Sequence, residues 1–415
     1  MVKLKNKKIL LIAFKYPHYA EVGAKRWVKL SKYLAEMGYK IHVVTVNWKI
    51  DGKNLDDIQH PNIIIHRIPS LYFHNLKYKN YKNNFTGNIK HLLRHGFLKI
   101  LSIIWYEDEA QFWGVYLIPF CKKLIKKEGI KNVIATGHPF MTNYWAAKLK
   151  MDLLEINLIQ DFRDPWNDDA IRSLPFRLTA KRSLQHEIFA LNNCDVLFAV
   201  TDGLMELLSK KIHANIKKVI IPNGFDAYIC SKDAVKRDFV FIYAGSLYCG
   251  RKEPLESFLK AVENVRKTTP ELKIKLYGLF PPNLEKKHEV LFKSGIISAY
   301  PPVSPEEIQK HIYKSFTCLH FNARIYPYLV SMKIYEYASL KRPTLCINYG
   351  GEIDTLIKKH KLGVSVNGDD IGQIEKEILK LYDTWQHDPY YEISPEGLEI
   401  YHYKNLAKEV EKYFK

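Results

Sequence analysis

Residues 9–46 read ILLIAFKYPHYAEVGAKRWVKLSKYLAEMGYKIHVVTV, and their pattern sets the fold class. An apolar run at 9–14 is followed by a glycine-containing loop, a helical pattern over 24–37, a glycine at Gly38 and a second apolar run at 41–46. Runs of this kind are typical of parallel strands that are buried on both faces and joined by helices. The sequence therefore predicts a strand–helix–strand unit and an α/β fold.

The same alternation recurs along the 415 residues, which is enough chain for two domains. Further strands are predicted at 133–136, 155–159, 196–200, 219–221, 239–244, 273–276, 317–321 and 344–347, and helices at 142–149, 256–268, 305–313, 333–340 and 373–385. The pattern restarts at 239 after a polar, irregular stretch. We expect domains at 1–230 and 231–395, and a C-terminal helix within 396–415 that packs back on the first domain.

The charge of the chain favours an anionic partner. Its 63 Lys and Arg against 44 Asp and Glu give a net charge of +19, while 47% hydrophobic residues exclude disordered and collagen-like classes. Residues 1–160 hold 26 basic and 11 acidic residues, a net charge of +15. The first domain is therefore the basic one.

The cysteines and the hydropathy pattern predict a cytoplasmic protein. The six cysteines are scattered, without metal-binding or disulfide-framework spacing. The longest apolar stretch, 97–120, is interrupted by Lys99 and by Glu107-Asp108-Glu109, so no membrane span is predicted. Tyr-Lys-Asn repeats within 71–94 and a basic, apolar segment at 91–105 suggest contact with an anionic membrane surface, with a solvated loop as the alternative.

A glycine turn follows the first strand of the second domain. Residues 245–252 read GSLYCGRK and have the G-x-x-x-x-G spacing of a phosphate loop, but Arg251-Lys252 replaces the Lys-Ser/Thr pair, so the magnesium-binding hydroxyl is missing. Backbone N–H groups with Arg251 or Lys252 can still hold a diphosphate. Downstream, Lys333 can reach a phosphate and Glu336 can accept hydrogen bonds from a ribose diol. The alternatives are that residues 245–252 form a plain turn and that Lys333 and Glu336 form only an i,i+3 ion pair.

Polar residues also follow strands of the first domain. His138 in Gly137-His138-Pro139 is a candidate acid or base, and Asp161 and Asp164 are candidates for a general base or for binding acceptor hydroxyls. Arg163 between them can instead be a structural ion-pair partner, and His138 a solvated loop residue.

The first helix offers a second candidate for anion binding. Gly23 and Arg26 lie at its start, where free N–H groups favour an anion. Only one glycine is present there, which disfavours a dinucleotide-binding oxidoreductase. The absence of Asp-x-Asp from the sequence predicts no metal-bridged nucleotide-sugar site, and the zinc-protease, hydrolase and kinase motifs are also absent.

Together these motifs resemble the GT-B fold glycosyltransferases of the family 4-like group over nearly the full chain. The resemblance rests on Gly23 with Arg26, Gly137-His138-Pro139, residues 161–166, residues 219–226 (VIIPNGFD), residues 243–248 (YAGSLY), and residues 333–337 (KIYEY) with Arg342-Pro343. It implies two Rossmann-like domains facing across a cleft and transfer of a sugar from a nucleotide-sugar to a glycan or lipid-linked acceptor in surface polysaccharide assembly.

The resemblance also implies roles for individual residues. Gly245, Ser246 and Arg251 would line the diphosphate, with Lys333 nearby and Glu336 on the ribose, while Gly23, Arg26, His138, Asp161, Arg163 and Asp164 would face the acceptor and the sugar. Basic side chains would take the place of a catalytic metal, so no cofactor is expected. Tyr328 stands where many retaining relatives carry a first glutamate, which leaves the donor-sugar contacts open although retention is still expected.

Two other functions remain open. A nucleotide-sugar epimerase uses the same two domains and needs no acceptor. The charge of +19, with Tyr and Lys interleaved at 76–90, also suggests a nucleic-acid-binding protein, although no known nucleic-acid-binding motif is present. We therefore expect a nucleotide-sugar, and not a nucleic acid, as the partner.

Overall fold

The computed structural model describes residues 7–17, 22–48, 60–71, 107–169, 177–226, 235–247, 250–281 and 283–415. The Tyr-Lys-Asn repeats and the segment at 91–105 lie outside these residues. The chain packs as two units, Met1–Pro222 with Tyr403–Lys415 and Asn223–His402. The boundaries expected from the sequence were residues 230 and 395.

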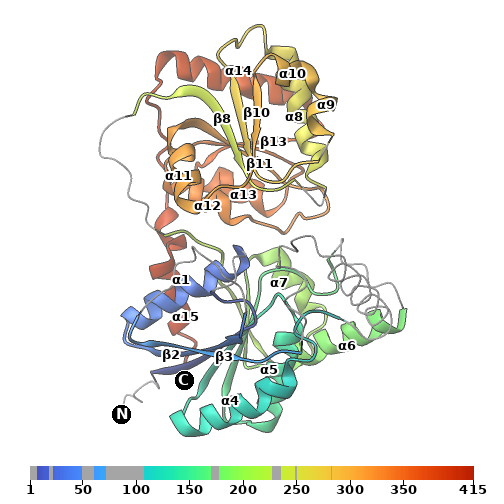
Figure 1. Ribbon diagram of the computed structural model, residues 1–415, viewed down its shortest axis with the longest axis vertical. Helices are drawn as coiled ribbons and strands as arrows, with labels where there is room; N and C mark the ends of the chain where they lie inside the picture. The colour runs from blue at the N-terminus through green and yellow to red at the C-terminus, as the bar shows by residue number, and fades with distance from the viewer. Residues whose placement is uncertain are drawn as a thin grey trace, which may run out of the picture. The chain divides into compact units, whose positions relative to one another are not determined.

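The first unit is a seven-stranded parallel sheet in the order β3-β2-β1-β4-β5-β6-β7 (Figure 1). Its strands are β1 Lys8–Ala13, β2 Lys40–Val46, β3 Ile63–Ile68, β4 Asn132–Thr136, β5 Asn157–Phe162, β6 Val196–Ala199 and β7 Lys217–Ile220. Its helices are α1 Val22–Glu36, α4 Gly114–Glu128, α5 Met141–Asp152, α6 Arg177–Asn192, α7 Asp202–Ser209 and α15 Tyr403–Glu411.

The second unit is a six-stranded parallel sheet in the order β10-β9-β8-β11-β12-β13. Its strands are β8 Asp238–Ala244, β9 Lys273–Tyr277, β10 Ile297–Tyr300, β11 Ser315–Phe321, β12 Thr344–Asn348 and β13 Gly363–Asn367. Its helices are α8 Lys252–Val265, α9 Leu284–Lys287, α10 Glu289–Lys293, α11 Pro305–Lys314, α12 Met332–Ser339, α13 Glu352–Lys359, α14 Ile371–His387 and the 3₁₀ helix η1 Leu398–Tyr401.

Each sheet is covered on both faces, as the apolar strands require. Leu10 and Ile12 of β1 pack in the core beneath α4, α5, α6 and α7, whereas Ile9 and Leu11 pack on the opposite face beneath α1 and α15. The second sheet is likewise buried between α8 and α14 on one face and α11, α12 and α13 on the other. The α/β fold with two Rossmann-like domains is thus confirmed.

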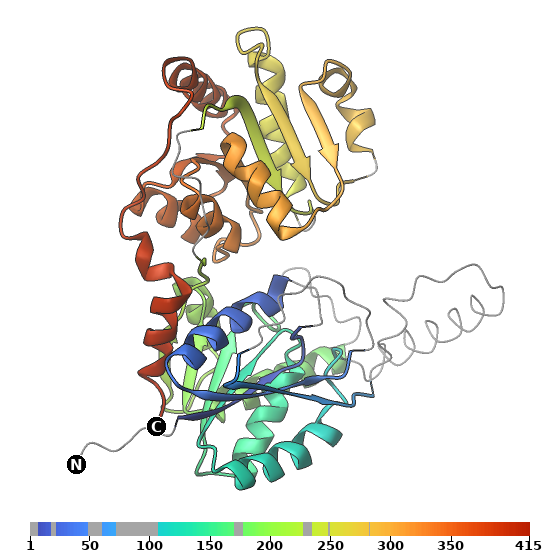
Figure 2. The same ribbon diagram turned by 60° about the vertical axis from the view of Figure 1, so that its left-hand side comes forward.

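The C-terminal helix α15 belongs to the first unit although it follows the second in sequence. It packs against α1, and Figure 2 shows α15 in red alongside α1 in blue. The Tyr39 hydroxyl donates to Glu411 Oε1 at 2.9 Å, and Asn157 Nδ2 donates to the Tyr413 carbonyl at 2.9 Å. The first unit is therefore assembled from both ends of the chain.

Candidate functional site

Both sheets reverse their strand order in the middle, between β1 and β4 in the first unit and between β8 and β11 in the second. In open α/β sheets ligands bind beyond the carboxyl ends of the strands at such a reversal, because the connecting loops there diverge to opposite faces. The residues that follow these four strands are therefore the first candidates for a functional site in each unit.

In the first unit the reversal is flanked by His138 and Lys15. His138 follows β4 and is exposed, with its Nδ1 3.5 Å from Nζ of Lys15, which follows β1. The His138 ring packs edge-on against Phe140, and the largely buried Lys15 ammonium lies 3.7 Å from Oε2 of Glu109. An exposed imidazole in this position can exchange a proton with a group that docks at this edge of the sheet.

Asp161 and Arg26 form a buried ion pair at the same edge. Asp161 Oδ1 accepts from Arg26 Nη2 at 3.1 Å, and Oδ2 accepts from Trp27 Nε1 at 2.7 Å and from Thr136 Oγ1 at 2.9 Å. Both side chains of the pair are at most 1% exposed. All these contacts of the Asp161 carboxylate are within the protein, which suits a residue that holds α1 against β4 and β5.

Arg26 also secures the last residues of the first unit. It donates to the carbonyl of Ile221 at 2.7 Å and to that of Pro222 at 2.5 Å. These two residues precede Asn223-Gly224, where the second unit begins. Arg26 thus joins the first helix, the fifth strand and the exit of the chain from the unit, and the buried guanidinium has no surface for contact with a ligand.

Arg163 and Asp164 follow β5 and are half-buried. Arg163 Nε donates to the Gly137 carbonyl at 2.8 Å, which ties the loop after β5 to the loop that carries His138. Burial raises the pKa of the Asp164 carboxyl, and the nearby Arg163 charge opposes this shift. A carboxyl group with a raised pKa is better suited to accept a proton near neutral pH.

The acidic triplet at 107–109 supports the loops at the carboxyl ends of β4 and β5. The sequence analysis did not predict this role. Glu107 Oε1 accepts from Trp166 Nε1 at 2.9 Å and from Ser183 Oγ at 2.5 Å, while its Oε2 lies 2.7 Å from His186 Nδ1. Asp108 accepts from the first backbone N–H of α5, that of Met141, at 2.9 Å. These carboxylates fix the loop after β5 and the start of α5.

Gly23 lies in the first turn of α1, and the loop at 18–21 that leads into this helix lies outside the described residues. The predicted anion site at this helix start therefore stays a prediction.

In the second unit Gly245 follows β8 with a φ of 152°, a conformation that favours glycine. A Cβ at Gly245 would collide with the Lys333 ammonium, which lies directly against the glycine backbone. Lys333 is in the first turn of α12, with Nζ 5.2 Å from the Tyr243 ring centroid, and its ammonium has no hydrogen bond or ion pair to any described residue. The structure thus brings Lys333 and Gly245 together.

Burial shifts the pKa of Lys333. Burial, with a smaller contribution from the positive charge of Arg251, lowers the pKa of Lys333 to about 8, and Glu336 opposes the shift. An ammonium held in this way is stabilised by any anion that binds beside it. Arg251, which precedes α8, is the second cation of this group.

His320 is a further member of this group that the sequence did not predict. It is the penultimate residue of β11 and is 2% exposed, and neither ring nitrogen has a partner among the described residues. Burial lowers the pKa of His320 well below its usual value, and the charges of Arg251 and Lys333 lower it further. The only sequence signal was a histidine at the end of an apolar strand.

The remaining predicted donor residues lie around Lys333. The Ser246 carbonyl accepts from the Tyr243 hydroxyl at 3.2 Å, and Glu336 is half-buried one turn along α12 from Lys333. Tyr328, in the place expected for a first glutamate, is half-buried between β11 and α12 with its ring 6.0 Å from that of Tyr326. Gly245, Ser246, Arg251, Lys333 and Glu336 therefore belong to one end of the second sheet.

No family model matches the sequence, and no curated protein sequence matches it. Solved structures do match. WaaG, a glycosyltransferase involved in lipopolysaccharide biosynthesis, is 12% identical with a TM-score of 0.58, over 98% of this chain and 99% of that chain. TarM of S. aureus, solved with UDP among its ligands, is 11% identical with a TM-score of 0.58, over 99% and 100%.

A putative UDP-N-acetylglucosamine 2-epimerase from Listeria monocytogenes is 13% identical with a TM-score of 0.52, over 97% of this chain and 94% of that chain. These structures match nearly the full chain, including both parallel sheets. The chain has the GT-B fold.

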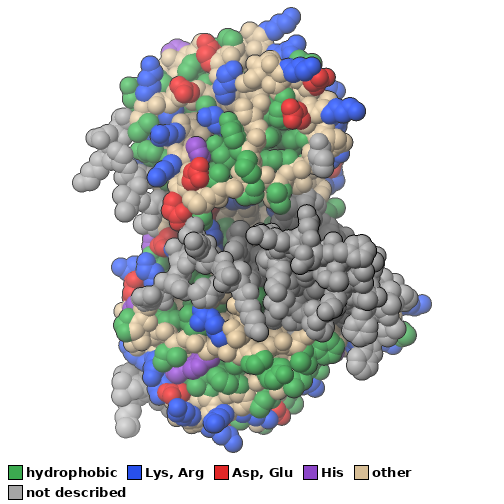
Figure 3. Space-filling model, in the orientation of Figure 1, with side chains coloured by type: hydrophobic (Ala, Val, Ile, Leu, Met, Phe, Trp, Pro, Cys, Tyr) green, Lys and Arg blue, Asp and Glu red, His purple; other side chains and the backbone are tan. Residues whose placement is uncertain are grey.

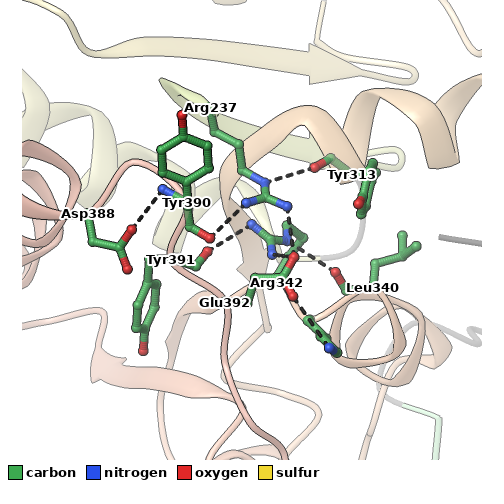
Figure 4. Close-up of polar contacts among 9 residues, drawn as sticks. Arg237, Tyr313, Leu340, Arg342, Asp388, Tyr390, Tyr391 and Glu392 are labelled. Atoms are coloured by element: carbon green, nitrogen blue, oxygen red, sulfur yellow. Dashed lines mark hydrogen bonds and ion pairs between the residues drawn. The ribbon is translucent and has the colours of Figure 1, made fainter. Parts of the chain in front are cut away.

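In this GT-B chain Arg342 of the Arg342-Pro343 motif has a structural place. Figure 4 shows Arg342 and Arg237 converging on Glu392, whose Oε1 accepts from Arg342 Nη2 at 2.8 Å and from Arg237 Nη2 at 2.9 Å. Both guanidiniums are buried, and they also donate to the carbonyls of Tyr391 and Tyr390. This cluster fixes the segment after α14 to the second GT-B domain.

The first GT-B domain also carries an apolar pocket, which lies beside the start of α5. Exposed hydrophobic side chains gather over α4 and α5 (Figure 3). Near the start of α4, Phe112 and Val115 are 37% and 64% exposed. They border a pocket of about 240 Å³ lined by Gln111, Phe112, Val115, Met141, Tyr144, Trp145, Arg182 and His186.

Across the described ranges, no three His, Cys, Asp or Glu side chains are grouped as a metal site. None of the helices described there is both long and apolar enough to cross a membrane.

Proposed function

We propose that the protein is a glycosyltransferase that uses a nucleotide-sugar donor, with the donor diphosphate held in the second domain. The observation that carries this proposal is the Lys333 ammonium, which lies against Gly245 at the reversal of strand order and has no ion pair among the described residues. A fixed cation in this place stabilises the negative charge that develops on a leaving diphosphate.

The donor contacts follow from this placement. Backbone groups of Gly245 and Ser246 lie against the diphosphate, Lys333 and Arg251 neutralise it, and Glu336 accepts hydrogen bonds from the ribose. These cations replace a metal, so the transfer is metal-independent, and it proceeds with retention of the anomeric configuration. The UDP bound to TarM supports a nucleotide ligand for this fold.

The first domain holds the acceptor. His138, Arg163 and Asp164 contact acceptor and sugar hydroxyls, with His138 as the acid or base because it is exposed at the reversal of strand order. Arg26 and Asp161 position these loops, since all their described contacts are within the protein. Gly23 lies at the helix start that faces the same strand ends.

The acceptor is a glycan or a lipid-linked glycan used in surface polysaccharide assembly at the inner face of the cell membrane. The apolar pocket beside Phe112 and Val115 supports a lipid-linked acceptor, because an acyl chain fits an apolar lining and Arg182 suits an anionic head group. Sedimentation with vesicles tests membrane binding. We expect binding to anionic but not to neutral vesicles at low salt. No binding to either kind of vesicle would overturn the proposed membrane association.

Thermal unfolding with UDP, GDP, CMP, TDP and their sugars tests the donor. A ligand at 100 times its Kd stabilises the folded state by about 2.7 kcal/mol, so one nucleotide should raise the Tm selectively. Lys333→Met should abolish this shift, whereas Lys293→Met, in an exposed pair with Glu289, should leave it unchanged. The absence of a shift with every nucleotide would overturn the proposed function.

An epimerase is the second candidate, because the Listeria protein described as a putative epimerase has the same fold. Incubation with the selected nucleotide-sugar separates the two. Transfer releases the nucleoside diphosphate when acceptor is present. Epimerisation changes the configuration of the sugar and leaves the sugar attached to the nucleotide. If nucleic acid binds at near-physiological salt and no nucleotide raises the Tm, the alternative of a nucleic-acid-binding protein, suggested by the net charge, is favoured instead.

A further inference from the structure

The buried histidine of β11 has no structural partner that accounts for its presence. His320 is 2% exposed, and both ring nitrogens lack a hydrogen-bond partner among the described residues. A buried polar group without a partner destabilises a folded protein, because it has given up its hydrogen bonds to water. An aliphatic side chain at this position would therefore give a more stable folded protein. The imidazole is explained if it binds a ligand.

The position of His320 indicates which kind of ligand its imidazole would bind. His320 pairs with Cys346 of β12, and it lies two residues beyond Cys318, which pairs with Ile242 of β8. Cys318 contributes to the core beneath α11 and α12, so His320, two residues along the strand, faces the same side. Helix α12, which carries Lys333 in its first turn, packs on that side of the sheet.

The charges around His320 exclude a role as a cation in the free protein. The burial of the ring and the charges of Arg251 and Lys333 all lower its pKa, so the free imidazole is neutral with one N–H donor and one acceptor nitrogen. A neutral N–H beside two cations is suited to share an anion with them, since all three donate to the same oxygens.

We propose that His320 is a binding residue of the donor site, whose N–H donates to a phosphoryl oxygen of the diphosphate held by Lys333. This inference rests on the proposed function, because it assigns one more residue to the same site. It explains why a polar side chain remains buried at the carboxyl end of the central strand, where strand order reverses.

The test separates binding from stability by using inorganic pyrophosphate and UDP as probes. His320→Leu should raise the Tm, since it removes an unpartnered polar group, and should weaken pyrophosphate and UDP binding in calorimetry by about tenfold or more. His320→Asn keeps a neutral N–H donor and should recover part of the affinity. An effect on binding opposite in sign to the effect on stability is not expected of a core residue.

Thr317 provides a matched control on the same strand. It is 0% exposed and its hydroxyl also lacks a described partner, but it lies an odd number of residues from His320 and so on the other face of the sheet. Thr317→Val should raise the Tm and leave both affinities unchanged.

The outcomes distinguish this inference from the proposed function. Wild-type affinity for both probes in His320→Leu overturns the role of His320 while the proposed function stands. A fall in Tm with equal loss of binding in His320→Leu and His320→Asn also overturns it, because His320 would then be structural. If the wild-type protein binds neither pyrophosphate nor any of the nucleotides, the proposed function itself fails.

Discussion

The ammonium of Lys333 occupies the space that a side-chain carbon on Gly245 would need. Gly245→Ala must therefore displace Lys333 and strain a backbone with φ 152°. We expect a stability loss of about 1 kcal/mol or more and at least a tenfold loss of UDP affinity, measured by urea unfolding and calorimetry. Gly295→Ala has a φ of +68° but open space around the new carbon, so it should lose stability without losing affinity.

Lys333 should make nucleotide binding depend on pH. Its pKa is about 8 in the free protein, and a bound diphosphate raises it, so binding takes up a proton. UDP affinity should fall as the pH rises above 8, where Lys333 of the free protein loses its proton. Titrations from pH 7.5 to 9.5, where the terminal phosphate of UDP is fully ionised, measure this, and the weak binding of Lys333→Met should be flat over the same range. A pH-independent wild type would rule out this role.

The lowered pKa of Lys333 also makes the free energy of unfolding depend on pH. The folded-state pKa of about 8 lies below the ordinary value of 10.5, so the unfolded chain binds more protons between these values. The contribution of Lys333 is therefore unfavourable below pH 8 and is relieved as the pH rises from 8 towards 10.5. Urea unfolding of the wild type relative to Lys333→Met should show a difference that narrows across this window.

Asp161→Asn should unfold the first domain more readily. It leaves the Arg26 guanidinium buried without its carboxylate, and removing one partner of a buried pair costs about 3–5 kcal/mol. Glu289→Gln breaks the exposed pair with Lys293 and should change the free energy of unfolding by less than about 1 kcal/mol. Normal stability with lost transfer activity in Asp161→Asn would show a direct chemical role instead.

Glu392→Gln should loosen the segment after α14. Two buried guanidiniums, Arg237 and Arg342, would share an amide oxygen in place of a carboxylate. Because Glu392 is partly exposed, we expect a loss of about 1–3 kcal/mol in the free energy of unfolding. The Ile393 amide, which donates to the Lys341 carbonyl, should exchange faster with deuterium. Lys341→Met removes only an exposed cation 3.5 Å from Glu392, and equal effects of both variants would contradict the assignment.

His138→Ala should lower kcat without affecting folding. Loss of a general acid or base typically costs about 10²–10⁴ in rate, and the exposed ring adds little to stability. Nucleotide release with the selected donor and acceptor measures this effect. His213, another exposed histidine of the first domain, provides the control, and equal activity of both alanine variants would remove His138 from the chemistry.

The sequence predicted the central strands well because each is a continuous apolar run. The runs at 9–14, 41–46, 133–136 and 239–244 correspond to β1, β2, β4 and β8. The edge strands β3, β10 and β13 were missed, because each is only partly buried and contains polar residues that interrupt its apolar run. Helix α4 was missed because Pro119 and the apolar residues around it obscure the helical period.

Side-chain roles were less predictable than strands. Asp161 and His138 have similar sequence settings, each at the end of an apolar run, yet Asp161 is enclosed by three donors and His138 is exposed. The difference comes from Arg26 and Trp27, more than a hundred residues away in sequence. His320 was missed because its burial without a partner and its closeness to Arg251 and Lys333 are visible only in the folded chain.

The packing of α15 on α1 has a consequence for the order in which the chain folds. Residues 223–402 form a unit from one continuous stretch of chain. The N-terminal unit, although made first, lacks Leu406, Ala407 and Val410 of its core until residues 403–415 follow. We therefore expect the core of the first domain to close only after residues 403–415 have left the ribosome, however early its other strands are made.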